Sequence, residues 1–433
     1  MCYNDFGDTM EEVKEQEIQP EIKQKSKKMP FTNYAMLITH GCNNAVSVFV
    51  TTFLISYIYE ISANYVLNIG LFYASNYLIM GLVLFLISHL VDKSNRVIFY
   101  RIAIVLRALF IVCVVFVGEK LAELVILAGA LHGTADAIYW ASLNVMKNEL
   151  ISSRFMKKFS TLQISIEKMV NFVLPIILGK LIDSASFKSS AYIVLVIAVI
   201  QMVVSFFIKS NRPENSKFDF KGFLNDVKTM GEKKKLIRLC WICSAFLGVL
   251  TVETCINTIF VMMTMKSNFA LGLVTGIFSM ISIIVLVLIR KYVKTGRRTW
   301  VYILCSILPV VSALLVVFVT RDWTIVVHNF VFIIANTIYS YLHDLYRNII
   351  IKKLGFYEDI AEYQCSVSLV IEFSRVATFV VMAILGAVCA SFGVSGILIG
   401  LKVFFFVSIL GFPAINWVLY KFEKNLIKME ILK

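Results

Sequence analysis

Four polar side chains recur every four residues within one long apolar stretch of this chain: His132, Asp136, Trp140 and Asn144. A four-residue spacing keeps side chains on one face of an α-helix, so these residues form a stripe about three turns long. A carboxylate in apolar surroundings is costly, and it is retained where it carries a proton or holds a polar solute. Asp136 is therefore a functional candidate.

A second carboxylate, Glu253, lies in another apolar stretch and has Asn257 four residues later. Two further stretches carry imidazole, amide and hydroxyl groups at helical spacing. Packing is the competing interpretation, because Asn, Ser and His side chains often hydrogen-bond between neighbouring helices in lipid. The residues expected to contact a solute are His40, Asn43, Asn44, His132, Asp136, Trp140, Glu253, Asn257, Asn336, Tyr339 and Ser340.

The elements that position these side chains are membrane-spanning helices. Hydrophobic residues make up 59% of the 433-residue chain and charged residues only 16%, far from the soluble norm. About 20 apolar residues cross the roughly 30 Å hydrocarbon layer as a helix. Twelve such segments are expected, at 35–59, 67–90, 97–118, 121–145, 161–183, 190–208, 239–262, 269–289, 299–319, 322–345, 365–389 and 395–420. The fold class is therefore an all-α polytopic membrane protein.

The basic residues indicate orientation rather than a nucleic-acid partner. The net charge is +14, but 32 of the 42 Lys and Arg residues fall in tails and loops on the side of the N-terminus, and 4 fall in loops on the other side. By the positive-inside rule both termini lie in the cytoplasm, in agreement with an even number of spans. The expected location is the cell (plasma) membrane, with membrane lipid as a partner and no nucleic acid.

A long hydrophilic interval divides the apolar segments into six and six. The expected organisation is a disordered cytoplasmic tail at 1–33, a six-helix bundle at 34–208, a cytoplasmic linker at 209–238, a second six-helix bundle at 239–420 and a cytoplasmic tail at 421–433.

An internal repeat relates the two bundles. The same register places the dipeptide Ile-Tyr at 138–139 opposite the Ile-Tyr at 338–339, and it places Lys147 opposite Arg347. Further short matches keep the same order along both halves, so duplication is the economical explanation. We therefore expect two pseudo-symmetric bundles.

Two cytoplasmic loops carry complementary fragments of one acidic and basic pattern. The first supplies Asp92, Lys93 and Arg96, and the second supplies Arg297 beside a glycine. In the first loop Asn95 replaces the turn glycine, and asparagine is the non-glycine residue that best tolerates a left-handed turn. The pattern resembles G-x-x-x-D-(R/K)-x-G-R-(R/K), which the major facilitator superfamily of secondary transporters carries at both places.

The resemblance to this superfamily covers essentially the whole chain and implies a fold and a mechanism. It implies two six-helix bundles that rock about a central cavity lined by the first, fourth, seventh and tenth spans, which are the spans that carry the polar residues. It also implies ion pairs that form and break near the cytoplasmic loops. The expected gating residues are Asp92, Lys93, Arg96, Glu167, Arg297, Glu372 and Arg375. Because Glu372 and Arg375 are three residues apart, a static ion pair is the alternative for them.

The function that these features favour is secondary active transport of a small solute, with a proton as a candidate coupling ion carried by Asp136 or Glu253. The mixed polar set suits a polar or cationic solute, because Lys and Arg are scarce at midspan. No enzyme activity and no cofactor are expected, since the chain has neither a P-loop nor an H-E-x-x-H motif. The alternatives are a transporter-like sensor or assembly protein and an integral membrane enzyme that acts on lipid.

Overall fold

The computed structural model describes residues 29–93, 95–209, 218–293, 298–354, 360–429 and 431. These residues form helices joined by short turns, with no strand among them. We call the elements from α1 to α7 the N-terminal set. They are α1 (Phe31–Val48), the π-helix η1 (Phe49–Leu54), α2 (Ile55–Ile61), α3 (Tyr65–Lys93), α4 (Arg96–Val117), the 3-10 helix η2 (Gly118–Ala122), α5 (Val125–Leu150), α6 (Ser153–Ser184) and α7 (Phe187–Ser205).

The elements from α9 to α15 form what we call the C-terminal set. They follow α8 (Phe220–Thr229) and the 3-10 helix η3 (Gly231–Lys233), and they are α9 (Lys234–Met265), α10 (Asn268–Tyr292), α11 (Thr299–Phe318), α12 (Asp322–Leu354), α13 (Ile360–Ala390), α14 (Gly393–Ile409) and α15 (Gly411–Lys428).

The connection between the sets is more structured than a plain linker. The interval 209–238 contains α8 and the first turn of α9. The helix α8 is amphipathic, and its residues Phe223 and Val227 are buried on one face. At the other end of the chain α1 begins at Phe31, within the stretch expected to be a disordered tail. The remainder of that tail, residues 1–28, lies outside the described residues.

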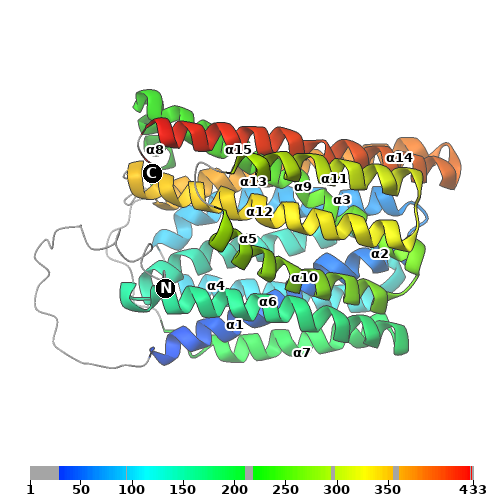
Figure 1. Cartoon of the computed structure of the whole chain (residues 1–433). Coiled ribbons are helices and arrows are strands. Elements are labelled where there is room, and N and C mark those ends of the chain that lie inside the picture. Colours follow the sequence, from blue (N-terminus) through cyan, green and yellow to red (C-terminus); the bar gives the residue numbers. More distant parts are fainter. Residues whose placement is uncertain are drawn as a thin grey trace, which may run out of the picture.

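The helices run roughly parallel to one long axis (Figure 1). The described N- and C-terminal residues and α8 are all at the left of this view, and we call this the terminal end of the bundle. The turns that join α6 to α7 and α9 to α10 lie at the opposite end. Both sets therefore begin and finish at the terminal end.

Eleven segments of the described chain are long and apolar enough to cross a membrane. Together they correspond to eleven of the twelve expected spans. The segment without this property is α5, which carries the stripe of His132, Asp136 and Asn144. Its 26 residues extend about 39 Å at 1.5 Å per residue, so its length suffices for a span and its polarity sets it apart. The count of twelve stays a prediction for this helix.

The outer faces of the bundle are apolar and exposed. Large Val, Ile, Leu and Phe side chains project from α7, α10, α11 and α14, as in Val196, Val287, Ile307 and Val403. Exposed apolar surface of this extent is stable where lipid replaces water. The membrane environment expected from composition therefore agrees with the distribution of side chains.

Glycines set the closest contacts between the two sets. The sets meet along α3 with α13 and along α6 with α10. A Cβ atom on Gly272 of α10 would lie 2.2 Å from the carbonyl oxygen of Pro175 on α6, and one on Gly179 would lie 2.3 Å from that of Asn268. Only glycine permits backbones to approach so closely in lipid. Both contacts lie in the half of the bundle away from the terminal end.

Candidate functional site

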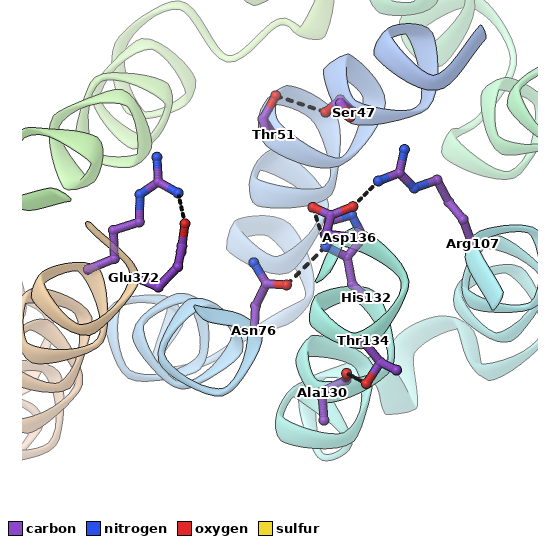
Figure 2. A network of polar contacts seen from close by, with 10 residues as sticks. Ser47, Thr51, Asn76, Arg107, Ala130, His132, Thr134, Asp136 and Glu372 are labelled. Atoms are coloured by element: carbon purple, nitrogen blue, oxygen red, sulfur yellow. Dashed lines mark hydrogen bonds and ion pairs between the residues drawn. The ribbon is translucent and has the colours of Figure 1, made fainter. Parts of the chain in front are cut away.

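Asp136 on α5 faces Arg107 on α4, and the two side chains form an ion pair between these helices (Figure 2). The guanidinium is buried, with 2% of the side chain exposed, whereas 16% of the Asp136 side chain is exposed. Arg107 also lies over the ring of Tyr139, 5.2 Å from the centroid. A charge at this depth needs a partner, and the chain supplies it from a helix 29 residues away in sequence. Sequence spacing could not identify Arg107 as this partner.

His132 extends the ion pair toward α3. Its Nδ1 lies 3.0 Å from Oδ1 of Asn76 and 3.7 Å from Oδ2 of Asp136, and Figure 2 shows Asn76 reaching it from the neighbouring helix. The two helices can approach because a Cβ on Gly133 would lie only 2.1 Å from the Asn76 carbonyl oxygen. Gly129 makes a similar contact one turn earlier, with its Cβ position 2.3 Å from the Phe72 carbonyl oxygen. Small residues four apart are a recognisable packing signal.

A second chain of hydrogen bonds joins α1, α5 and α6. Lys147 Nζ donates to Oε1 of Gln163 at 3.0 Å, and Gln163 Nε2 lies 3.3 Å from Nε2 of His40. His40 Nδ1 in turn lies 3.1 Å from the hydroxyl oxygen of Tyr139. Trp140 lies beside this chain, with its ring 6.1 Å from that of His40 and 36% of the residue exposed. Gln163, Lys147 and Tyr139 were not identified from sequence.

Asn44 connects α1 to α6 at a neighbouring level. Its amide nitrogen donates to Oδ1 of Asn171 at 2.7 Å and to the backbone carbonyl oxygen of Glu167 at 3.2 Å. The Glu167 side chain is half-buried, and among the described residues no base lies within ion-pair distance of its carboxylate. Asn43, the adjacent residue on α1, is buried. Within the N-terminal set the residues expected to contact a solute thus gather on α1 and α5, and α6 adds partners to them.

Glu253 is placed differently from the expectation that it faces a space shared by the two sets. Its side chain is 0% exposed, and its contacts all lie within the C-terminal set. Oε1 lies 2.9 Å from Nε2 of His328 on α12 and accepts from Nδ2 of Asn257 at 3.1 Å. The hydroxyl of Ser408 on α14 lies 3.5 Å from Oε2. In this structure no solute can reach Glu253, because the rotation of α9 turns it toward α12 and α14.

Replacing Glu253 with glutamine is expected to change the free energy of unfolding by less than about 1 kcal/mol, whereas alanine lowers it by about 1–3 kcal/mol. The Ser312 hydroxyl donates to the Pro309 carbonyl oxygen, so Nδ1 of His328 donates to Ser312. The pair Glu253 and His328 therefore holds one proton on the line between Oε1 and Nε2, and a glutamine amide can take either role.

Equilibrium unfolding in mixed micelles of mild detergent and dodecyl sulfate measures both variants. If glutamine and alanine lower the free energy of unfolding equally, this account of the pair is wrong. It is also wrong if alanine does not lower the free energy of unfolding.

The three residues of α12 that were expected to contact a solute have different surroundings. Tyr339 is buried, and its hydroxyl donates to the backbone carbonyl oxygen of Cys243 on α9. Asn336 and Ser340 are half-buried on α12. The hydroxyl of Tyr339 is engaged in packing in this conformation, and contact with a solute stays a prediction for all three residues.

Glu372 and Arg375 on α13 form the expected pair, with Nη1 2.9 Å from Oε1. Nε of Arg375 also donates to the hydroxyl oxygen of Thr251 on α9 at 3.1 Å. The guanidinium lies 4.8 Å from the ring centroid of Tyr77 on α3, which belongs to the other set. The pair thus lies at the junction of the two sets, while gating by it stays a prediction.

The motif in the first loop adopts a different geometry from a glycine turn. Asn95 has φ −72° and ψ 102°, and its side chain accepts from the backbone N–H of Val97, so it is the N-cap of α4 rather than a left-handed residue. Arg96 follows it and is buried. Asp92 and Lys93 end α3, but their side chains lie outside the described part of the chain, and so does Arg297.

A cluster at the opposite end joins the sets, and the sequence analysis did not identify it. Asp183 of α6 caps the start of α10: Oδ1 accepts from the N–H of Asn268 at 3.0 Å, and Oδ2 accepts from the Ser267 hydroxyl at 2.7 Å and the N–H of Phe269 at 2.9 Å. From α2, the hydroxyl of Ser56 donates to the Asn268 side chain, whose amide donates to Glu60. We call Ser56, Glu60, Asp183, Ser267 and Asn268 the latch. A carboxylate at a helix N-terminus is favourable because it accepts from unpaired N–H groups and faces the positive end of the helix dipole.

Replacing Asp183 with alanine is expected to weaken the contact between the sets by about 1 kcal/mol, the usual value of a lost N-cap, which is about fivefold in an equilibrium. Hydrogen exchange of the amides at 267–272 measures the effect, and these amides should exchange faster. The control is Asp322→Asn, which changes an exposed acid at the same end but within the C-terminal set. Unchanged exchange in Asp183→Ala would rule out a role for the latch.

Two cysteines three residues apart, Cys240 and Cys243, have a spacing that also occurs in redox and metal sites. Both residues are 0% exposed on α9, and Sγ of Cys240 lies 3.2 Å from the Tyr363 hydroxyl oxygen. Among the described residues no group of three or more His, Cys, Asp or Glu side chains could hold a metal ion.

Two sets of membrane-length helices with apolar outer faces and buried polar contacts define a polytopic helical membrane protein. The chain belongs to the Major Facilitator Superfamily, whose family model matches residues 35–357. It is 22% identical over 254 residues to the uncharacterized protein YqgE of Bacillus subtilis (strain 168). That match spans 57% of this chain and 57% of YqgE.

Solved structures of two transporters have the same fold. The crystal structure of the nucleoside transporter NupG has a TM-score of 0.66 and 11% sequence identity, over 91% of this chain and 99% of that chain. The structure of a bacterial homolog of the human lysosomal transporter Spinster, in an inward-facing and unoccupied conformation, has a TM-score of 0.63 and 11% identity. It covers 92% of this chain and 97% of that chain. At this level of identity the likeness establishes the fold.

Proposed function

We propose that the protein is a secondary active transporter that moves a small solute across the cell membrane by alternating access. The two moving bodies are the bundles at 34–208 and 239–420, and the terminal end faces the cytoplasm, as the positive-inside rule requires. Membership of the Major Facilitator Superfamily supports this proposal. The absence of a P-loop in the sequence favours a solute or ion gradient as the energy source.

The observation that carries the proposal is the uneven distribution of contacts between the sets. At the opposite end, glycine contacts hold α6 against α10 and the latch ties α2 and α6 to the start of α10. Toward the terminal end, Trp140 and Asn144 on α5 are exposed and Ile164 on α6 is 48% exposed, while α3 keeps its packing against α13. Contacts closed at one end and side chains exposed at the other are the pattern of an inward-open transporter.

The proposed solute site lies on the N-terminal set around Asp136. This carboxylate is partly exposed, and it is held by Arg107 and His132 rather than enclosed as Glu253 is. A proton or a solute can therefore compete with Arg107 for Asp136 without unfolding the helices. Proton coupling through Asp136 is the finer proposal, and solute flux that is independent of a pH gradient would contradict it.

Uptake into liposomes tests the function. Purified protein is reconstituted into liposomes that contain an extract of bacterial metabolites. The liposomes are then placed in a second portion of the extract, and mass spectrometry follows solute exchange. Protein-free liposomes are the control. We expect at least one small solute to exchange only where protein is present. If folded protein exchanges nothing from the extract under a pH gradient, a sodium gradient or neither, the transport proposal is wrong.

A further inference from the structure

Several buried charges of the bundle are neutralised in pairs, whereas Lys147 near the terminal end of α5 is not. Arg107 pairs with Asp136, Arg375 with Glu372, and Glu253 with His328. Lys147 on α5 instead donates to a neutral amide, Oε1 of Gln163, and lies 5.9 Å from the ring centroid of Phe159. Among the described residues no carboxylate lies within ion-pair distance of its ammonium group.

The internal repeat indicates which acidic partner Lys147 lacks. The register that places Lys147 opposite Arg347 also places Asn144 opposite Asp344. In the C-terminal set, Nη2 of Arg347 lies 3.2 Å from Oδ1 of Asp344 one turn earlier, so that base is neutralised on its own helix. In the N-terminal set the base is kept, and the residue in the place of the acid is the neutral Asn144.

The hydrogen-bond chain holds this ammonium group deep in the protein. Because an ammonium group only donates, Gln163 must present its oxygen to Lys147 and its amide N–H to Nε2 of His40. His40 then donates from Nδ1 to the hydroxyl oxygen of Tyr139. Gln163 is ten residues from the start of α6, about 15 Å along the helix axis, whereas a lysine near a helix end ordinarily extends toward water. The hydrogen bond to Gln163 leaves two N–H donors of Lys147 unused.

We propose that Lys147 binds an anionic group of the transported solute, a carboxylate or a phosphate monoester, with the exposed side chains of Trp140 and Asn144 beside it. The inference rests on the proposed transport function and names its substrate class. Among the described side chains of α1, α5 and residues 163–171 of α6, the charges without an ion-pair partner are Lys147, Lys168 and Glu167, which leave one positive charge in excess. An organic anion completes this balance, whereas the cationic solute favoured by residue counts adds to the excess.

Fluorescence quenching of Trp140 tests the positive charge directly and requires no knowledge of the solute. The full-length protein keeps Trp140, and the other four tryptophans become phenylalanine: Trp241, Trp300, Trp323 and Trp417. Iodide is the anionic probe and acrylamide the neutral one. In Lys147→Gln the iodide quenching constant should fall about two- to fivefold at low salt, while the acrylamide constant stays the same.

Two matched variants define the controls. Lys147→Arg keeps the charge and should keep the iodide constant, and Lys188→Gln removes an exposed lysine at the opposite end and should also leave it unchanged. Equal iodide quenching in wild type and Lys147→Gln overturns the proposal. So does a fall of the same size in Lys188→Gln, because the effect would then follow the net charge of the protein.

Thermal stability with small probes then separates a soluble anion from a lipid headgroup. Benzoate and phenyl phosphate should raise the melting temperature of wild type more than the neutral benzamide, and this difference should vanish in Lys147→Gln. Stabilisation by benzamide alone, or by none of the three, contradicts the proposal. If nanodiscs of phosphatidylglycerol, but not of phosphatidylcholine, suppress iodide quenching, the site belongs to lipid and the proposal is also wrong. None of these measurements requires flux, so transport of a neutral solute would overturn the anion site and leave the transport function intact.

Discussion

Replacing Asp136 with leucine is expected to lower the free energy of unfolding by about 3–5 kcal/mol, because it leaves the Arg107 guanidinium buried without its carboxylate. The guanidinium is 2% exposed and cannot turn to water without displacing α4 from α5. Equilibrium unfolding in mixed micelles of mild detergent and dodecyl sulfate measures the loss.

The double variant Asp136→Leu with Arg107→Met separates stability from function. Removing both charges should recover most of the lost stability, because apolar side chains of similar size pack without a desolvation cost. If Asp136 also contacts the solute, the double variant will be stable and inactive in liposomes. A double variant no more stable than Asp136→Leu would show that the two side chains do not act as a pair.

Valine in place of Gly133 is expected to lower stability, whereas valine in place of Gly272 is expected to lower transport, although the steric conflict is nearly the same. The added Cβ would lie 2.1 Å from the Asn76 oxygen in one case and 2.2 Å from the Pro175 oxygen in the other. Gly133 lies between α5 and α3 of one set, which cannot part, so the cost of overpacking appears as a loss of stability of about 1–3 kcal/mol or more.

Gly272 lies between the two sets, which can part at the opposite end if they rock as proposed. Gly272→Val should therefore have nearly the same free energy of unfolding as wild type. The backbone amides at 267–276 should exchange hydrogen faster. The rate of solute transport should fall at least about tenfold, because the conformation with this contact closed is disfavoured by more than about 1.4 kcal/mol. Gly272→Ser serves as a smaller matched change. Equal destabilisation by valine at both positions would show that the α6 and α10 contact never opens.

Much of the helical architecture could be predicted from the sequence because lipid imposes a simple rule on it. A run of about 20 apolar residues has few stable alternatives to a spanning helix, and eleven of the expected spans have apolar counterparts in the structure. The exception, α5, is less apolar because of the same polar stripe that marked it as functional. The π-helix at Phe49–Leu54 within the first span carries no comparable signal.

The rotation of each helix about its axis was much harder to predict. Glu253 and Asp136 look alike in sequence, yet one is enclosed by α12 and α14 and the other is partly exposed beside Arg107. In lipid a polar side chain has only to find a polar partner, and partners on other helices leave no spacing signal. Glu372 and Arg375 could be paired in advance because they lie on the same helix.

Some of the missed features had readable signals. Gly129 with Gly133, and Gly272 with Gly276, have the four-residue spacing of small residues that permits close helix contacts, and each pair lies at such a contact. In α8 the spacing of Phe220, Phe223 and Val227 is amphipathic and predicts a short surface helix. The latch had no such signal, since its residues come from three separate parts of the sequence, α2, the end of α6 and the start of α10.

The helix α8 contacts both sets of the bundle. Its Phe220 packs on Phe85 of α3 with ring centroids 5.6 Å apart, and its Phe223 packs on Tyr363 of α13 at 6.4 Å. The N–H of Asp219 also donates to Oε1 of Glu362 on α13, at 2.9 Å. If α3 slides past α13, α8 must either move with one of these helices or lose an aromatic contact with the other. The free energy of that contact then limits how far the two sets can separate at the terminal end.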